Sequence, residues 1–432
     1  MTDGDGGRDD RTLGEVLHRR MAELYPICRS ITGDGVRQTL EIVGREVPLQ
    51  TKSVSSGTAA FDWTVNDEWN VRDAYIADLD GRRLVDFRDS NLHLMSYSVP
   101  VRARLTFDEL RPHLHTLPEH PDWIPYRTTY YSRTWGFCLT QAQLDSLGPG
   151  PFDVMIDSSI GPGELNYGEL VVPGDSADEV VISAHVCHPS LANDNLSGIV
   201  VAAELAKAVL ALDRRRFTYR FLFAPGTIGS IVWLSQNPEI WPRIRHGLVL
   251  TGLGGGGKLT YKQTRQADRM IDRVAAHVLG PAGGDLRSYS PYGYDERQFN
   301  AVGFDLPVGR LSRTPHGEYP EYHTSADNLD FVGPEELAES YATVWRILHI
   351  LEREQKYRNL SPFGEPQLGK RGLYPTTGGK AASDAVMAML WTLGYSDGEH
   401  STLDIAETAG LTFDAIDEAA TILGGAQLLD PT

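Results

Sequence analysis

The sequence has few cysteines, no long apolar run and a deficit of basic residues. Its three cysteines, among 432 residues, are too few and too scattered for a disulfide framework, which fits a reducing compartment. No segment approaches the roughly 18 uninterrupted apolar residues of a membrane-spanning helix. Lys and Arg number 40 and Asp and Glu number 58, and the net charge of -18 repels phosphate backbones and anionic membranes. We therefore expect a cytoplasmic protein that binds neither nucleic acid nor a membrane.

The length predicts two or three compact units. Residues 1–11 are acidic and rich in glycine, without the apolar segment of a signal peptide, so we expect a disordered tail. Residues 12–50 and 160–358 are assigned to one discontinuous core. Short β-like pieces separated by turns predict an inserted, mostly β domain at residues 51–159. Residues 361–432 form the last unit.

Strand-like and helix-like segments alternate in the core. VVISAHV, TYRFLFA and HGLVLTG are strand-like, and amphipathic helical segments follow them. A closing helix is expected at about residues 334–354, because Pro334 and the acids after it suit a helix N-terminus. This alternation predicts an α/β fold with a mixed sheet and helices on both faces.

The last unit resembles a winged helix-turn-helix. It has a short helix, Gly410 in the turn, a second helix and a small terminal strand. Residues 361–432 contain three basic and ten acidic residues, and the second helix carries Asp414, Asp417 and Glu418 without a cation. A DNA-reading module is expected to be basic. We therefore expect this unit to pack against protein, including another copy in a homo-oligomer, rather than against DNA.

Two segments carry the residues of a metal site. In HVCHPSLANDNLSG, residues 185–198, His185 is expected at the C-terminal end of a strand and Asp194 just before a helix. Ligands bind at that edge of open α/β sheets. The segment RTPHGEYPEYHTSADNLD, residues 313–330, adds His323. Two imidazoles and a carboxylate suit zinc or another divalent ion and leave room for water.

These residues resemble the zinc aminopeptidase superfamily, which includes bacterial dizinc leucyl aminopeptidases and glutaminyl cyclases. In that family a strand-end His, an Asp in an Asp-Asn-x-Ser-Gly turn and a late His-Thr-x-x-Asp motif bind metal. The matches here are His185, Asp194 in DNLSG and His323 in HTSAD, within roughly residues 165–355. The whole chain is similar to bacterial aminopeptidase-like proteins with such a core, an inserted β domain and a C-terminal winged helix. YPICRSITGDGVRQTL, FDWTVNDEWNVRDAYI and YDERQF carry that similarity. The resemblance implies a zinc-aminopeptidase-like sheet flanked by helices.

The chain also departs from the dizinc pattern. Cys187 replaces the Asp of the His-x-Asp motif, which orients the histidine in the family. Gly226 and Thr227 stand where the family has adjacent glutamates, and the run Gly254–Gly257 where it has another carboxylate ligand. A two-metal site thus loses two carboxylates, so we expect one metal per chain.

The remaining site residues are predicted from their chemistry. Asp295 and Glu296 are the candidates for the proton-transferring base, with an exposed charged turn as the alternative. His188 is expected to orient or face the substrate rather than to bind the metal, and Cys187 to be a buried thiol. Glu318 and Arg313 would hold a substrate's amine and carboxylate, unless they form a structural ion pair. Aromatic walls and further anion contacts are expected from Tyr292, Tyr294, Tyr319, Tyr322, Arg297 and Arg310.

The sequence therefore favours a metal-dependent hydrolase of the aminopeptidase type, which cleaves an amide bond in a small peptide or amino-acid conjugate. Two alternatives stay open. One is a non-hydrolytic reaction on the same metal site, such as acyl transfer, cyclisation or modification of a metabolite. The other is a catalytically inactive protein that binds a ligand and contacts a protein partner through its winged helix.

Overall fold

The computed structural model describes residues 10–313, 315–373 and 384–432. The chain forms two compact units, of which the first ends at Val344 and the second covers Trp345–Thr432. The expected disordered tail lies outside the described residues except for its last two, which begin α1 (Asp10–Leu24). Among the helices of the described ranges, none combines the length and the apolar character that a membrane crossing requires.

An eight-stranded mixed sheet forms the centre of the first unit. In spatial order its strands are β1 (Gln50–Ser55), β10 (Glu164–Val172), β12 (Thr218–Ala224), β11 (Glu179–His185), β13 (Ile244–Leu250), β16 (Val308–Arg313), β14 (Leu259–Lys262) and β15 (Asp285–Arg287). The four middle strands β12, β11, β13 and β16 run parallel. Every residue of β11 is buried, as expected for a central strand covered on both faces.

The first strand, β1, belongs to this core sheet, although the sequence pattern assigned residues from 51 onward to the insertion. β1 pairs antiparallel with β10, from Gln50 opposite Glu169 to Ser55 opposite Glu164. The insertion therefore begins after Ser55. The boundary was placed too early because β1 is short and its partner in the sheet follows more than a hundred residues later.

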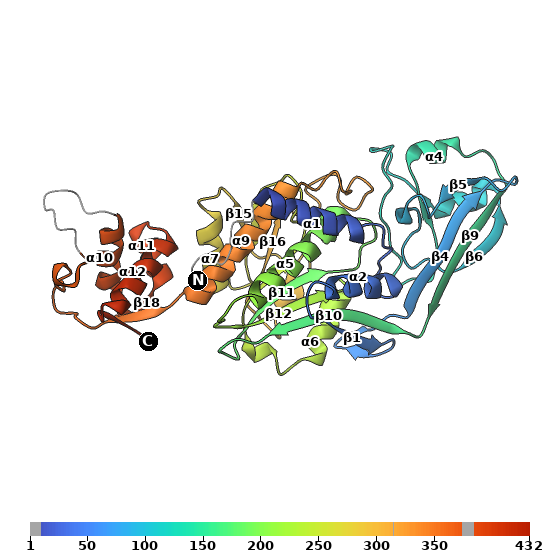
Figure 1. Cartoon of the computed structure of the whole chain (residues 1–432). Coiled ribbons are helices and arrows are strands. Elements are labelled where there is room, and N and C mark those ends of the chain that lie inside the picture. The colour runs from blue at the N-terminus through green and yellow to red at the C-terminus, as the bar shows by residue number, and fades with distance from the viewer. Residues whose placement is uncertain (1–9, 314, 374–383) are drawn as a thin grey trace. The chain divides into compact units, whose positions relative to one another are not determined.

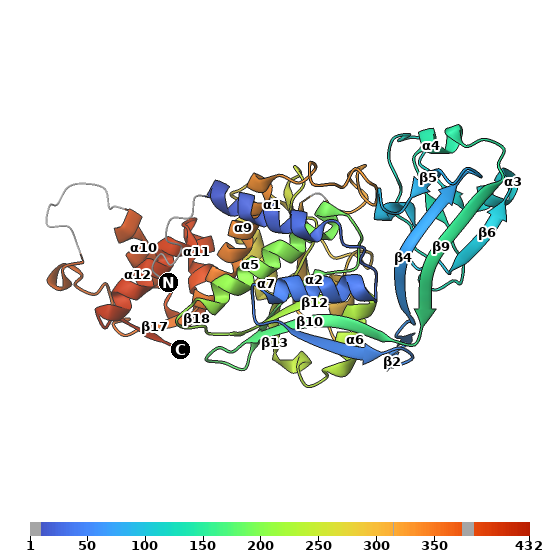
Figure 2. The same cartoon turned by 45° about the vertical axis from the view of Figure 1, so that its right-hand side comes forward.

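Helices flank the sheet on both faces, which confirms the predicted α/β architecture. Figures 1 and 2 show α1, α2 (Asp34–Gly44) and α5 (Gly198–Leu210) over one face and α6 (Ile228–Gln236) against the other. The other helices of the core are α7 (Met270–Leu279), α8 (Glu296–Phe299) and α9 (Pro334–Arg353). α9 begins at the expected proline, with Glu335 and Glu336 in its first turn.

The insertion is built on a four-stranded antiparallel sheet. Its strands, in spatial order, are β5 (Arg83–Asp86), β4 (Glu68–Ala77), β9 (Phe152–Gly161) and β6 (Val101–Leu105). Alternate residues of β9, including Phe152, Val154 and Ile156, are buried, as expected for a sheet with one covered face. Shorter elements complete it: β2 (Ala59–Ala60), β3 (Trp63–Thr64), β7 (Leu114–His115), β8 (Phe137–Cys138), α3 (Phe107–Leu110) and α4 (Gln141–Ser146).

The second unit is a winged helix-turn-helix. Its elements are β17 (Lys356–Asn359), α10 (Asp384–Tyr395), β18 (Asp397–Ser401), α11 (Thr402–Ala409), α12 (Phe413–Gly425) and β19 (Leu429–Pro431). Gly410 has a φ of 66° between α11 and α12, a left-handed conformation that glycine adopts readily. In α12, Asp414 pairs with Arg346 and Asp417 pairs with Arg353, both from the last turns of α9. Two acids of the second helix are thus engaged within the unit itself.

Candidate metal centre

Two histidines from distant segments meet at one buried carboxylate. His185 ends β11, Asp194 lies in the helical turn η3 (Ala192–Ser197) before α5, and His323 lies in the loop before α9. His185 Nε2 is 2.8 Å from one carboxylate oxygen of Asp194, and His323 Nε2 is 3.0 Å from the other. The structure therefore brings together the three residues that the sequence analysis selected as metal ligands.

A third imidazole, from His188, faces the same carboxylate. His188 Nδ1 lies 3.9 Å from Asp194 Oδ1, and its ring centroid lies 5.0 Å from that of His185 and 5.1 Å from that of His323. Ligand atoms of His185, His188 and Asp194 all lie within 4.8 Å of one another. His188, expected only to orient or face the substrate, thus joins the candidate ligands.

The charge states of the cluster suit a divalent ion. Burial lowers the pKa of His188 to about 3, so its imidazole is neutral with a free lone pair. Burial acts to raise the pKa of Asp194, but the surrounding imidazoles outweigh it and hold that pKa well below its ordinary value. Neutral imidazole nitrogens around an ionised carboxylate form a donor set that fits zinc. These residues therefore fit a divalent metal ion.

Cys187 leaves His185 without the carboxylate support found in the dizinc pattern. Its Sγ accepts the N–H of Gly226 at 3.1 Å, and burial raises the pKa of the thiol to about 12. His185 Nδ1 is buried and has no hydrogen-bond partner in the described part of the chain. The imidazole stacks instead on Tyr294, with ring centroids 5.3 Å apart and planes inclined by 20°. Packing on Tyr294 therefore orients the His185 imidazole, as a hydrogen bond to the second ring nitrogen usually does in a metal-binding histidine.

Asp327 fixes the backbone that carries Asp194. Its carboxylate accepts the N–H of Asn193 at 2.5 Å and the N–H of Asp194 at 3.0 Å. All three residues are at most 1% exposed, so water cannot replace these bonds. Burial raises the pKa of Asp327 to about 8, against the lowering effect of the two donors. The HTSAD motif contained this residue, but sequence reasoning gave it no role.

The glycine run after β13 supports the same turn. Asn193 Oδ1 accepts the N–H groups of Gly254 at 2.8 Å and Gly255 at 3.1 Å, and Asn195 Oδ1 accepts that of Gly252 at 3.2 Å. Glycine is also needed at position 198, because a Cβ there would stand 2.5 Å from Leu250 O. Where the dizinc pattern has a carboxylate, this chain therefore offers backbone donors that hold the metal loop.

Aromatic rings enclose the cluster. Tyr322 stacks on His323 with ring centroids 3.9 Å apart, which places it where the sequence expected a wall. Tyr126 packs edge-on against His188 and His323, at 5.3 and 5.1 Å between centroids, and its N–H donates to His323 O at 2.8 Å. Tyr126 belongs to the insertion, and no motif marks it. Sequence reasoning missed it because only the fold brings residue 126 beside residue 323.

The two candidate bases have different surroundings. Asp295 is 2% exposed and accepts the N–H of Thr227 at 2.6 Å. Burial raises the pKa of Asp295 above its ordinary value, and the nearby His185 opposes that rise. Glu296 lies 2.8 Å from the Lys262 ammonium and 3.6 Å from the Arg310 guanidinium. Both acids are buried, so the alternative of an exposed charged turn is wrong.

Arg297 and Arg310 lie near the cluster but are partly engaged. Arg310 is 2% exposed, contacts His316 Nδ1 at 3.3 Å and lies 5.5 Å from the centre of the Tyr294 ring. Arg297 donates to Thr227 Oγ1 at 3.3 Å. The Nε of each arginine is buried without a hydrogen-bond partner among the described residues. Each therefore keeps one donor for a further group.

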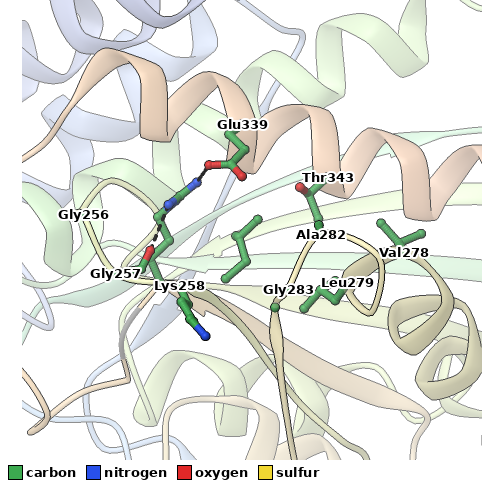
Figure 3. Close-up of a pocket in the computed structure, with 12 residues that line it drawn as sticks. Gly256, Gly257, Lys258, Val278, Leu279, Ala282, Gly283, Glu339 and Thr343 are labelled. Carbon is green, nitrogen blue, oxygen red and sulfur yellow. Dashed lines mark hydrogen bonds and ion pairs between the residues drawn. The ribbon is translucent and has the colours of Figure 1, made fainter.

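Arg313 and Glu318 do not form the expected clamp for a substrate. Arg313 lines a cavity of about 260 Å³ between the loop after β13, the end of α7 and α9, and none of the lining residues belongs to the metal cluster (Figure 3). Its guanidinium binds Glu339, Ser340 Oγ at 3.0 Å and Gly257 O at 2.9 Å. Glu318 forms a bidentate ion pair with Arg287. Both charges are neutralised by residues far away in the sequence, which the motif could not reveal.

Two family models match successive parts of the chain. Residues 18–354 match the family model described as Domain of unknown function (DUF4910), and residues 355–431 match a winged helix-turn-helix model. The chain belongs to the DUF4910 family. A protein of Clostridium acetobutylicum is 46% identical over 421 residues, which cover 96% of each chain. That relative bears the provisional name polysaccharide biosynthesis protein with aminopeptidase-like domain.

Solved structures show that the core has the fold of zinc aminopeptidases. A crystal structure from Clostridium acetobutylicum, provisionally described as a peptidase, has a TM-score of 0.93 and 44% identity and covers 98% of this chain and 97% of its own. The zinc aminopeptidase BSAP of Bacillus subtilis has a TM-score of 0.55 and 14% identity, over 78% of this chain and 94% of its own. The fold is thus aminopeptidase-like, and the sequence resemblance is confirmed.

Proposed function

We propose that this DUF4910 protein is a metal-dependent hydrolase, with one zinc ion per chain, that cleaves an amide bond in a small peptide or amino-acid conjugate. The observation that carries the proposal is the meeting of His185, His188 and His323 around Asp194 at the carboxyl edge of the sheet. A divalent ion bound there supplies polarisation of a carbonyl and a water acidified to a pKa of about 7.

Asp295 is the residue that we assign to proton transfer. Its raised pKa suits a group that takes and returns a proton, and the Thr227 N–H holds one of its oxygens in place. Glu296 is less suitable, because Lys262 and Arg310 neutralise it. Its role is to hold these two cations, of which Arg310 lies 5.5 Å from the centre of the Tyr294 ring and Lys262 lies 5.4 Å from that of Tyr289. Tyr294 and Tyr322 would pack against the substrate, and Arg297 and Arg310 would supply positive charge near it.

One observation favours a non-hydrolytic reaction as the second candidate. At the positions of the usual glutamates, the N–H groups of Gly226 and Thr227 bind Cys187 and Asp295. Glycine and threonine side chains supply no carboxylate there, so a water molecule has fewer groups to take its proton. Acyl transfer or cyclisation, in which an amine of the substrate attacks instead of water, places less demand on such a base.

Metal retention tests the site itself. Purified protein is loaded with zinc, dialysed and measured by elemental analysis, alongside His323→Ala and the matched control His400→Ala, whose histidine pairs with Asp397 in the second unit. We expect about one zinc in the wild type and the control, and at least a roughly hundredfold weaker affinity in His323→Ala. Equal retention in both variants would refute the ligand assignment.

A panel of substrates separates the two reactions. Zinc-loaded protein is incubated with aminoacyl amides, dipeptides and amino-acid conjugates, and products are identified by mass spectrometry. Hydrolysis adds water to the products, whereas cyclisation or transfer does not. Cleavage that requires zinc and is absent in His323→Ala supports the proposal. Zinc-dependent products that lack added water would support the second candidate.

A further inference from the structure

The insertion contains an open cavity with a distinctive lining. Its volume is about 490 Å³, and it lies between the segment around His113 and the loop at residues 127–135. Tyr130, Tyr131 and Trp135 line it together with Arg127, and none of the described residues that line it is acidic. The cation in this acid-free cavity attracts negatively charged ligands locally, although the chain as a whole has a net charge of -18.

Arg127 differs from most other arginines of the insertion. Ion pairs with aspartates engage Arg72, Arg83, Arg88, Arg104 and Arg133. Arg127 is exposed and has no ion pair with any residue that the structure describes. Nearby His115 is neutral, because burial and the charge of Arg127 lower its pKa to about 4. The cavity therefore presents one unpaired cation and no acidic side chain among the described residues that line it.

The other lining groups suit a polyhydroxylated ring. His113 stacks on Trp135 with centroids 3.7 Å apart and planes inclined by 9°, and Tyr131 is 64% exposed. The hydroxyl groups of Thr128, Ser132 and Thr134 have no hydrogen-bond partner within the described ranges. A sugar has apolar C–H faces that pack on aromatic rings and hydroxyl groups that need such partners.

A chain of contacts connects this cavity to the metal cluster. The hydroxyl of Tyr130, which lines the cavity, lies 2.8 Å from the hydroxyl of Tyr126. The ring of Tyr126 packs on His188 and His323. A molecule bound in the cavity would therefore be separated from the candidate metal-binding residues by the side chains of Tyr130 and Tyr126.

We propose that the cavity binds an acidic sugar unit, whose carboxylate or phosphate pairs with Arg127 and whose ring packs on Tyr131 and Trp135. This binding does not depend on the metal. The idea that the sugar is part of the conjugate processed at His185, Asp194 and His323 rests on the proposed function.

Titration calorimetry of the full-length protein tests the binding. The probes are glucuronate, glucose 6-phosphate and uncharged glucose, and the variants are Arg127→Gln, Tyr131→Ala and Arg82→Gln, a matched control on the same insertion outside the cavity. We expect at least one acidic probe to bind with a millimolar dissociation constant and glucose to bind more weakly. Arg127→Gln should weaken the acidic probe about tenfold, and Arg82→Gln should leave it unchanged.

Three outcomes would overturn the proposal: no binding of either acidic probe, equal binding of glucose, or equal effects of Arg127→Gln and Arg82→Gln. The preferred acidic probe tells whether the group is a carboxylate or a phosphate. The titration is repeated on zinc-free His323→Ala protein, where binding should persist. Sugar binding without hydrolysis would therefore refute only the proposed function, and hydrolysis without sugar binding only this inference.

Discussion

Replacing Asp327 by alanine should destabilise the protein and release the backbone at the metal site. The carboxylate accepts the N–H groups of Asn193 at 2.5 Å and Asp194 at 3.0 Å, and alanine would leave both without a partner in a region that excludes water. Each buried unsatisfied N–H costs about 1–3 kcal/mol, so the free energy of unfolding should fall by about 2–6 kcal/mol. Asp327→Asn keeps one acceptor oxygen and should lose about half as much.

Urea denaturation of zinc-free protein, followed by circular dichroism of the first unit's transition, measures this loss. Asp330→Ala is the matched control, because Asp330 is an exposed acid in the same loop, and it should change stability by less than about 0.5 kcal/mol. In zinc titrations, Asp327→Ala should also bind the metal more weakly, because Asp194 is no longer held at its backbone. A loss below about 1 kcal/mol in Asp327→Ala would refute the reasoning.

Three further predictions concern the base, the core and the pH dependence. Asp295→Asn should lower kcat about 10²–10⁴-fold and keep bound zinc, measured by steady-state kinetics and elemental analysis; an unchanged kcat excludes Asp295 as the base. Arg220→Ala should lower the free energy of unfolding, measured in urea, by about 3–5 kcal/mol, because it leaves the buried carboxylate of Glu179 without its ion pair. A loss under about 1 kcal/mol would contradict this. A hydrogen bond from Arg37 lowers the pKa of Glu68 from 4.5 to about 2. The ionised Glu68 therefore stabilises the folded protein fully above pH 4.5, and this stabilisation is lost as the pH falls toward 2. Glu68→Gln should remove this contribution to the pH dependence and lower the free energy of unfolding by about 1–2 kcal/mol at pH 7. Unfolding curves of the wild type and Glu68→Gln that coincide at every pH from 7 to 3 would show that the pair contributes nothing.

Local sequence patterns were sufficient for the core of the fold. The apolar run of β11 and the helical spacing after Asp194 predicted a strand, a turn and a helix, and the structure has β11, η3 and α5 there. Hydrophobic periodicity reports on neighbours along the chain, so it succeeds within single elements. It indicated a β-like segment at TKSVSS, residues 51–56, but not that this strand, β1, joins the core sheet, because that membership depends on hydrogen bonds to β10.

The residues of the site also fall into two groups: those that local motifs reveal and those that only the fold brings together. His185 and Asp194 lie nine positions apart and could be linked by a motif, and HTSAD supplied His323. Tyr126, by contrast, reaches the cluster only because the insertion folds against the His323 loop.

Residues that are adjacent in the sequence also lie in different environments. Asp295 and Glu296 follow one another at the start of α8, and successive side chains of a helix point about 100° apart. One therefore meets the Thr227 N–H and the other meets Lys262. Arg313, although it begins the motif segment, turns toward Glu339 of α9. No spacing along the chain predicts such partners.

The sequence by itself determined the aminopeptidase-like core, the winged helix and the chemical identity of His185, Asp194 and His323. Secondary structure follows from the local order of residues, and the donor atoms of a side chain follow from its residue type. Only the tertiary structure decided which groups surround that carboxylate. It added His188, Asp327 and the insertion to the site, because burial, hydrogen bonding and charge pairing there depend on contacts between segments that lie far apart in the chain.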